Sequence, residues 1–246
     1  GAGRIVFQDL LRITNDIKEG GAKTNPVIKK LMEDTKNSSG RLHLLGLISD
    51  GGVHSHIDHF KGMCLLAKEY GIKEVYIHAF TDGRDTPPNS GLSYITDLDN
   101  FLKENNAGQI ADITGRFYAM DRDKRWDRVE KAWNLIRNGV GESTAKNPVE
   151  AMKSSTETDE FVKPVKIEGI DGVLKDGDSV FMMNFRADRV RELVSIMIND
   201  DFDGFNRGAK PNLNVVTMTE YEKSFGLPIA YPPEDLVNIL GEVVSN

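Results

Sequence analysis

The chain has 246 residues, a formal net charge of −7 and a hydrophobic content of 39%. This length suits one large α/β domain or two small ones, with enough apolar side chains to fill a core. The acidic balance argues against nucleic acid or a membrane surface as a partner. The single cysteine, Cys64, excludes a disulfide framework and is typical of a reducing compartment. Because no apolar run approaches the roughly 20 residues of a membrane-spanning helix, we expect a cytoplasmic protein.

Helices and short apolar strands alternate along the first part of the chain. After a helix from Ile5 to about Lys18 and a second one from Pro26 through Met32, the sequence predicts strands at Leu42–Ile48, Val75–Phe80 and Ile110–Thr114, each followed by a helix, at His56–Tyr70, Leu92–Lys103 and Trp126–Ile136. Short apolar strands separated by helices indicate a mostly parallel sheet that is buried on both faces. We therefore expect an α/β fold with three layers, α/β/α.

The pattern changes after Asn147 and then returns. The sequence predicts a short helix at Pro148–Lys153, an edge or antiparallel strand within Val162–Ile167, a strand at Ser179–Phe185, a helix at Ala187–Ile198 and a last strand at Leu213–Met218. An amphipathic helix, Glu234–Val244, follows three prolines. The sheet is therefore expected to be mixed, with its parallel part dominant.

Five arginines lie in or just after segments that are predicted to be the carboxyl ends of strands. They are Arg84, Arg116, Arg122, Arg186 and Arg189. Ligands of an open α/β sheet bind outside the carboxyl ends of its strands, so these side chains are expected to converge there. A guanidinium group donates two parallel hydrogen bonds to a phosphate or carboxylate. The arginines therefore predict a site for an anionic substrate.

The segment Thr81–Pro88 is the most distinctive of the chain, because it places Arg84 next to Asp85 in a loop stiffened by two prolines. Arg84 can hold a carboxylate while Asp85 exchanges a proton with a hydroxyl group of the substrate. The alternative is an ordinary Asp-Gly turn with a local ion pair. We favour the functional interpretation, since a rigid loop positions both groups for catalysis.

The segment Ser49–His56 follows the first strand of the sheet and offers His54 as a functional residue. Ser55 is a candidate for the N-cap of the next helix. A metal site is the alternative, since His54, His56 and His59 could share an ion. No acidic ligand is obviously matched to these imidazoles, so we expect no metal in this chain.

The last two arginine-bearing segments follow the third and the later parallel strand. In Gly115–Arg122, Arg116 and Arg122 are expected to reach inward, whereas Arg125 and Arg128 are expected on a solvated face or in ion pairs. Arg186 and Arg189 are expected to begin a helix, where free backbone N–H groups suit a phosphoryl group. The alternative for this pair is a salt bridge to Asp188.

Several familiar nucleotide-binding and nucleophile motifs are missing. The sequence has no GxxxxGK[ST] loop, no GxGxxG after the first strand and no serine flanked as in a nucleophile elbow. It therefore predicts an anion-binding site without an evident nucleophile.

Taken together, four segments closely resemble the cofactor-independent (2,3-bisphosphoglycerate-independent) phosphoglycerate mutases. They are Ser49–His56, Asp82–Pro88, Gly115–Arg122 and Asn184–Arg189. The similarity covers essentially the whole chain and implies the phosphotransferase, or substrate-binding, domain of that two-domain enzyme. It implies a linker at 1–8, this domain at 9–225, and a linker and helix at 226–246 that return to the absent phosphatase domain.

The resemblance implies interconversion of 3-phosphoglycerate and 2-phosphoglycerate in glycolysis and gluconeogenesis, without 2,3-bisphosphoglycerate. A phosphoserine and two divalent metal ions, typically Mn²⁺, would belong to the absent domain. The chain alone would then be an inactive monomer. The implied roles are a clamp on the glycerate for Arg84, Arg116 and Arg122, acid/base catalysis for Asp85, and contacts with the phosphoryl group for Arg186, Arg189 and, beside them, His54.

Two other functions stay open from the residues alone. A non-catalytic sugar-phosphate-binding module would explain the arginines but would leave Asp85 without a role. A His-based metallohydrolase would instead use His54, His56 and His59.

Overall fold

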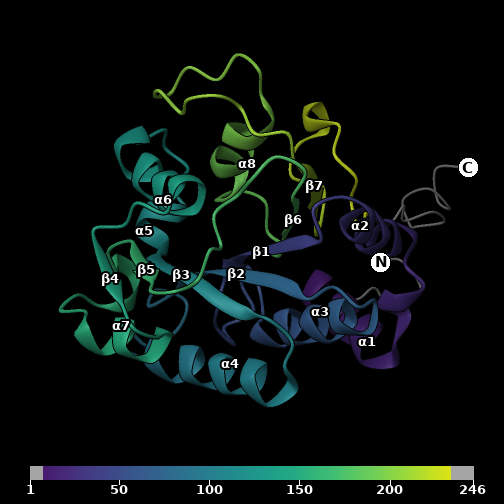
Figure 1. Cartoon of the computed structure of the whole chain (residues 1–246), viewed down its shortest axis with the longest axis horizontal. Coiled ribbons are helices and arrows are strands. Elements are labelled where there is room, and N and C mark those ends of the chain that lie inside the picture. The colour runs from purple at the N-terminus through teal and green to yellow at the C-terminus, as the bar shows by residue number, and fades with distance from the viewer. Residues whose placement is uncertain (1–7, 234–246) are drawn as a thin grey trace, which may run out of the picture.

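The computed structural model describes residues 8–233, which form a seven-stranded sheet with helices on both faces (Figure 1). The strand order is β4-β5-β3-β2-β1-β6-β7. The strands are β1 (Arg41–Leu47), β2 (Glu74–Thr81), β3 (Gln109–Gly115), β4 (Ser143–Ala145), β5 (Val165–Ile167), β6 (Ser179–Met182) and β7 (Asn214–Thr217). All neighbouring strands are parallel except β3 and β5. The predicted mostly parallel, mixed sheet is confirmed.

Helices cover the two faces of this sheet and complete the three predicted layers. They are α1 (Asp9–Glu19), α2 (Pro26–Asn37), α3 (Ile57–Glu69), α4 (Gly91–Asn105), α5 (Arg116–Ala119), α6 (Trp126–Asn138), α7 (Pro148–Ser154) and α8 (Arg191–Ile198). Short 3₁₀ helices lie at Gly21–Lys23, Asp159–Phe161 and Lys223–Phe225. Leu44 of β1 belongs to an apolar cluster that includes residues of α1 to α4 and α7, whereas the next residue, Leu45, belongs to a second cluster with residues of α6 and α8. Side chains of a strand alternate between its faces, so one apolar strand supplies both cores.

Local capping explains where two helices begin. The Asn25 side chain accepts hydrogen bonds from the backbone N–H groups of Val27 and Ile28, and Pro26 follows at the first helical position of α2, as predicted. The N-cap of α3 was predicted to be Ser55, and this is wrong. His56 has the extended backbone of an N-cap, and its Nδ1 accepts from the Asp58 backbone N–H at 3.2 Å.

One predicted helix begins later in the structure than expected, one strand was not predicted, and one predicted helix lies outside the described residues. Helix α8 begins at Arg191 rather than at Ala187. The preceding chain is held instead by the loop after β1, because the backbone N–H of Phe185 donates to the His54 carbonyl. Strand β5 is antiparallel to β3, as predicted, but the unpredicted strand β4 forms the edge of the sheet. The predicted helix Glu234–Val244, like residues 1–7, lies outside the described residues.

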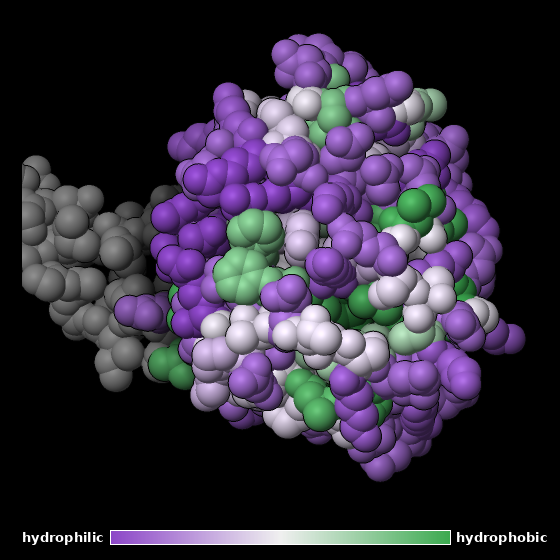
Figure 2. All heavy atoms as spheres, turned by 90° about the vertical axis from the view of Figure 1, so that its left-hand side faces the viewer, coloured by the Kyte–Doolittle hydropathy of each residue, from purple (hydrophilic) through white to green (hydrophobic). Residues whose placement is uncertain are grey.

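The surface is largely polar on the face at the left of Figure 1. Figure 2 shows hydrophilic residues over most of this face, with small separate apolar groups between them. Within residues 8–233, none of the helices is sufficiently long and apolar to span a bilayer.

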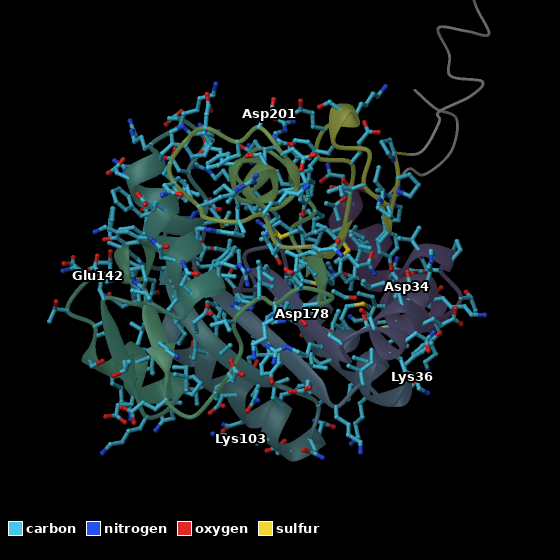
Figure 3. All side chains as sticks on the ribbon, turned by 45° about the horizontal axis from the view of Figure 1, so that its top comes forward. Asp34, Lys36, Lys103, Glu142, Asp178 and Asp201 are labelled. Carbon is cyan, nitrogen blue, oxygen red and sulfur yellow. The ribbon has the colours of Figure 1, made fainter. Side chains whose placement is uncertain are left out.

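A row of buried polar side chains crosses the middle of the sheet and was not predicted. Asp178, just before β6, accepts from Arg41 Nε at 3.2 Å and contacts His43 Nε2 at 3.0 Å. His43 Nδ1 lies 3.0 Å from His78 Nε2, whose Nδ1 lies 2.6 Å from Asp112 Oδ2. Figure 3 shows Asp178 in the interior, whereas the other labelled residues lie at the periphery. We call these five residues the buried polar row.

Candidate functional site

The carboxyl ends of four parallel strands bring the predicted segments to one edge of the sheet. Strands β1, β2, β3 and β6 are adjacent and parallel, so the loops that follow them leave from the same side (Figure 1). These loops contain all seven predicted site residues: His54, Arg84, Asp85, Arg116, Arg122, Arg186 and Arg189. The topology therefore supplies the convergence that was expected from strand ends.

Asp82 organises the loop that carries Arg84 and Asp85. Its Oδ1 accepts from the backbone N–H groups of Asp85 at 3.0 Å and Arg84 at 3.2 Å, and its Oδ2 accepts from Ser49 Oγ at 2.8 Å. Burial raises the pKa of Asp82, but hydrogen bonds from Asp85, Ser49 and Arg116 outweigh it and the pKa is lowered. Gly83 has φ +69° and no room for a side chain, because a Cβ would lie 2.7 Å from a backbone nitrogen. Hydrogen bonds to Asp82 and the close packing around Gly83 therefore both fix the conformation of this loop.

Arg116 is the centre of the site. It is the first residue of α5, directly after β3, and is only 3% exposed. Its Nη1 donates to Asp82 Oδ1 and to Asp85 Oδ2, both at 2.6 Å, and its Nη2 lies 3.0 Å from His54 Nε2. A guanidinium group has only donors, so His54 Nε2 must accept this bond and carries no proton.

His54 is buried and uncharged at neutral pH. Burial, followed by the adjacent charge of Arg116, lowers the pKa of His54 to about 4. Since Nε2 accepts from Arg116, the proton of the neutral ring is on Nδ1, which faces Asp188 Oδ1 at 3.7 Å. His54 Nε2 also lies 3.6 Å from Asp85 Oδ2. The two residues predicted to be catalytic therefore meet at Arg116.

Asp188 connects the remaining part of the site. Its Oδ2 accepts from Arg122 Nη1 at 2.9 Å, and its Oδ1 lies 3.1 Å from Arg186 Nε. Burial raises the pKa of Asp188, but Arg186, His54 and Arg122 together lower it. The salt bridge between Arg186 and Asp188, which was the alternative interpretation, is present. It extends to Arg122 and His54, which are far from Asp188 in the sequence.

A hollow of about 370 Å³ opens beside Arg116. Six arginines line it: Arg84, Arg116, Arg122, Arg125, Arg128 and Arg189. His54, Asp85 and Arg186 do not line it and lie behind or beside its wall. Arg125 and Arg128, which were expected on a solvated face or in ion pairs, pair with Asp123 and Asp121, and both border the hollow.

Arg189 is the site arginine with the fewest partners. Its Nη1 is 3.4 Å from the Met120 carbonyl, and no carboxylate of residues 8–233 lies within ion-pair distance of it. Burial, then the charges of Arg122, Arg116 and Arg84, lowers its pKa. A half-buried guanidinium among other guanidiniums lacks a counter-ion, so it is the natural first contact for an anion.

The three histidines of the alternative metal site do not converge on one point, although the ring centroids of His56 and His59 lie 5.6 Å apart. His59 Nε2 is bonded to Thr14 Oγ1 at 2.8 Å, whereas His54 Nε2 faces Arg116. In the part of the chain that the structure describes, no group of three or more His, Cys, Asp or Glu side chains is placed to hold a metal ion. The metallohydrolase interpretation requires the three histidines to share one ion, and their positions in the structure do not support it.

Sequence reasoning missed Asp82 and Asp188 as site residues. Asp82 could have been predicted, because an Asp directly before a glycine turn commonly accepts hydrogen bonds from backbone N–H groups of that turn. Asp188 was considered only as a partner of Arg186, and its contacts with Arg122 and His54 depend on the packing of separate loops.

The fold and the site define an α/β domain that presents arginines to an anion at the carboxyl edge of its sheet. The sequence model of the family described as "BPG-independent PGAM N-terminus (iPGM_N)" matches residues 13–223. This chain belongs to that family, in agreement with the resemblance of the four segments.

Relatives and a solved structure agree with this assignment. The chain is 50% identical over 254 residues to 2,3-bisphosphoglycerate-independent phosphoglycerate mutase of Clostridium perfringens, with 100% of the chain and 49% of the relative covered. It is 47% identical over 252 residues to 2,3-bisphosphoglycerate-independent phosphoglycerate mutase 2 of Methanosarcina acetivorans, covering 100% and 48%. A crystal structure of Leishmania mexicana phosphoglycerate mutase at low cobalt concentration aligns with a TM-score of 0.87 at 30% identity, covering 100% and 48%. The chain thus spans about half the length of the curated relatives it matches.

Proposed function

We propose that this chain is the substrate-binding, phosphotransferase domain of a phosphoglycerate mutase that interconverts 3-phosphoglycerate and 2-phosphoglycerate. The observation that carries the proposal is the arrangement around Arg116, which contacts Asp82, Asp85 and His54 beside an arginine-lined hollow. The family membership and the names of the relatives support it. As in those relatives, the reaction would need no 2,3-bisphosphoglycerate.

The site residues would divide between binding and proton transfer. Arg84, Arg116 and Arg122 would hold the glycerate and its carboxylate. Asp85, whose side chain is 21% exposed, would give a proton to the substrate oxygen that loses the phosphoryl group and later take one from the hydroxyl that receives it. Arg186 and Arg189 would offset the charge of the phosphoryl group during transfer.

The divalent metal ions that the resemblance implies do not fit the residues of this site. Asp82 and Asp85 already face Arg116, and His54 Nε2 accepts from the same guanidinium, so a cation there would meet a positive charge. We therefore assign the ions and the nucleophile to a phosphatase domain outside this chain. Residues 1–8 and 226–246 would link the two domains in a monomeric cytoplasmic enzyme, and this chain alone would be inactive.

Calorimetric titration of the chain with 3-phosphoglycerate in metal-free buffer tests the binding function. We expect measurable binding, and Arg189→Ala should weaken it about tenfold, which corresponds to about 1.4 kcal/mol. Lys131→Ala, which removes one surface charge that pairs with Glu142, should leave the affinity unchanged. Absence of binding to the folded chain, or binding only after Mn²⁺ is added, would contradict the proposal.

A further inference from the structure

The carboxylates of the site nearly balance its predicted arginines. Each of four arginines already has an internal anion: Arg116 contacts Asp82 and Asp85, Arg84 contacts Glu160, and Arg122 and Arg186 share Asp188. An incoming anion therefore meets arginines whose charges are largely occupied. The affinity of these arginines for the anion therefore depends on how easily the anion displaces each internal carboxylate.

Asp188 differs from the other internal anions in the way it is held. Asp82 is anchored by backbone N–H groups as well as by Arg116. For the Asp188 carboxylate, the contacts within residues 8–233 are with cationic or ionisable side chains, those of Arg122, Arg186 and His54. No backbone hydrogen bond fixes this carboxylate, so it can leave its partners without breaking a turn.

The contact between Asp188 and His54 is also incomplete. Asp188 Oδ1 and His54 Nδ1 are both buried, and neither makes a hydrogen bond among the described residues, although Asp188 Oδ1 forms an ion pair with Arg186 Nε at 3.1 Å. Asp188 Oδ1 and His54 Nδ1 face one another at 3.7 Å, which is too long for a hydrogen bond. Since His54 Nδ1 carries the ring proton, a donor and an acceptor stand opposite each other without meeting. An oxygen placed closer to His54 than Asp188 Oδ1 would satisfy this donor.

We propose that Asp188 is an affinity- and specificity-determining residue that acts as a displaceable internal counter-ion in the anion site. Its carboxylate occupies Arg122 and Arg186 in the free protein, and a bound phosphoryl or carboxylate group takes its place. A small anion such as inorganic phosphate has few other contacts with which to offset this competition. A ligand that carries both a phosphoryl and a carboxylate group also engages Arg84, Arg116 and Arg189. Asp188 thereby favours the larger ligand with two anionic groups, and this inference rests on the proposed function.

The test compares two variants that remove the same charge from different places. Asp188→Asn keeps the shape of the side chain but not its charge. Asp123→Asn removes a carboxylate that borders the hollow, is 59% exposed and pairs with Arg125. Calorimetry on the 246-residue chain with inorganic phosphate and with 3-phosphoglycerate, in metal-free buffer, gives four affinities to compare with the wild type.

We expect Asp188→Asn to bind inorganic phosphate about fivefold more tightly, a change typical of removing exposed competing ion pairs. The gain for 3-phosphoglycerate should be smaller, so discrimination between the two ligands falls. Asp123→Asn should change either affinity less than twofold. Asp188→Ser, which also removes the charge, should act in the same direction if the Asn variant folds poorly.

Unchanged or weaker phosphate binding by folded Asp188 variants would overturn the inference, because a purely structural role predicts loss of binding. Equal gains in Asp188→Asn and Asp123→Asn would overturn it too, since that result reflects net charge alone. The outcome for the proposed function is separate. If Asp188→Asn gains affinity for phosphate while no chain binds 3-phosphoglycerate, the counter-ion role stands and the proposed substrate is wrong.

Discussion

Two ionic clusters lie at different levels of the same parallel strands, one within the sheet and one beyond its carboxyl edge, and they are balanced in different ways. The buried polar row begins at Asp178 and Arg41, at the amino ends of β6 and β1, and all of its members are buried. The arginine site lies beyond the carboxyl ends, where a hollow admits solvent and Arg189 has no carboxylate partner among residues 8–233. The first cluster is closed on itself, whereas the second leaves a positive charge for a ligand.

Proton counting shows how the buried polar row closes. Its three contacts, Asp178 to His43, His43 to His78 and His78 to Asp112, each need one proton. Two neutral imidazoles supply two protons, so the row holds one more. Burial lowers the pKa of His43 to about 4, so this imidazole is neutral at neutral pH. The Arg41 guanidinium offsets the charge of Asp178, and all five side chains are buried, so the row offers no exposed charge to a ligand.

The largest expected effect comes from opening the closed cluster. Asp178→Ala leaves Arg41 and His43 buried without their anion, and we expect the free energy of unfolding to fall by about 3–5 kcal/mol. Urea denaturation measures this change. Asp171→Ala, which removes an exposed carboxylate paired with Lys175, is the control and should cost less than about 1 kcal/mol. A loss that small for Asp178→Ala would mean that the row contributes little to stability.

Acid should weaken both clusters through their histidines. Burial lowers the pKa of His43 and of His54 to about 4, below the ordinary value of 6.5. Between these values the unfolded chain binds protons that the folded chain does not, so the free energy of unfolding decreases as the pH falls. We expect each of the two histidines to lower the free energy of unfolding by about 2 kcal/mol between pH 6.5 and pH 4.5. Urea denaturation at both pH values measures this change. In His54→Asn the free energy of unfolding should fall less steeply as the pH falls. An unchanged dependence on pH would show that His54 does not contribute to it.

A conservative change at the centre of the open cluster should affect binding more than stability. Arg116→Lys keeps the charge, but one ammonium group cannot reproduce the planar fork that reaches Asp82, Asp85 and His54. We expect binding of 3-phosphoglycerate to weaken about tenfold, or about 1.4 kcal/mol, by calorimetry. Full affinity in the lysine variant would show that charge alone holds the ligand.

The smallest effect is expected at the rim of the open cluster. Glu160 accepts from Arg84, whose side chain is 58% exposed, at 3.2 Å. Because exposed ion pairs contribute little, Glu160→Gln should change the free energy of unfolding by less than about 0.5 kcal/mol. If Glu160→Gln lowered the free energy of unfolding by more than about 1 kcal/mol in thermal or urea denaturation, this pair would contribute to stability as a buried ion pair does.

Much of the fold and of the open cluster could be predicted from local patterns. Apolar runs such as Leu42–Ile48 and the helices between them specify a parallel sheet, because both faces of each strand must be buried. Parallel strands place their carboxyl ends together, so Arg84 and Arg116 could be assigned to one site before any contact was known. The closed cluster carried no such signal, since His43 and His78 lie singly within apolar strands.

The sequence by itself therefore determined the layers and the edge of the sheet at which the arginines meet, because these follow from periodicity and strand direction. It predicts an anionic ligand at that edge. Only the tertiary structure decided which carboxylate meets which arginine. Asp188 reaches Arg122 and His54 through loops from different strands, and Asp178, just before β6, reaches His43 of the neighbouring strand β1. Ionic contacts act over a few ångströms, whereas the residues that make them are many positions apart, so the fold must form before their partners are defined.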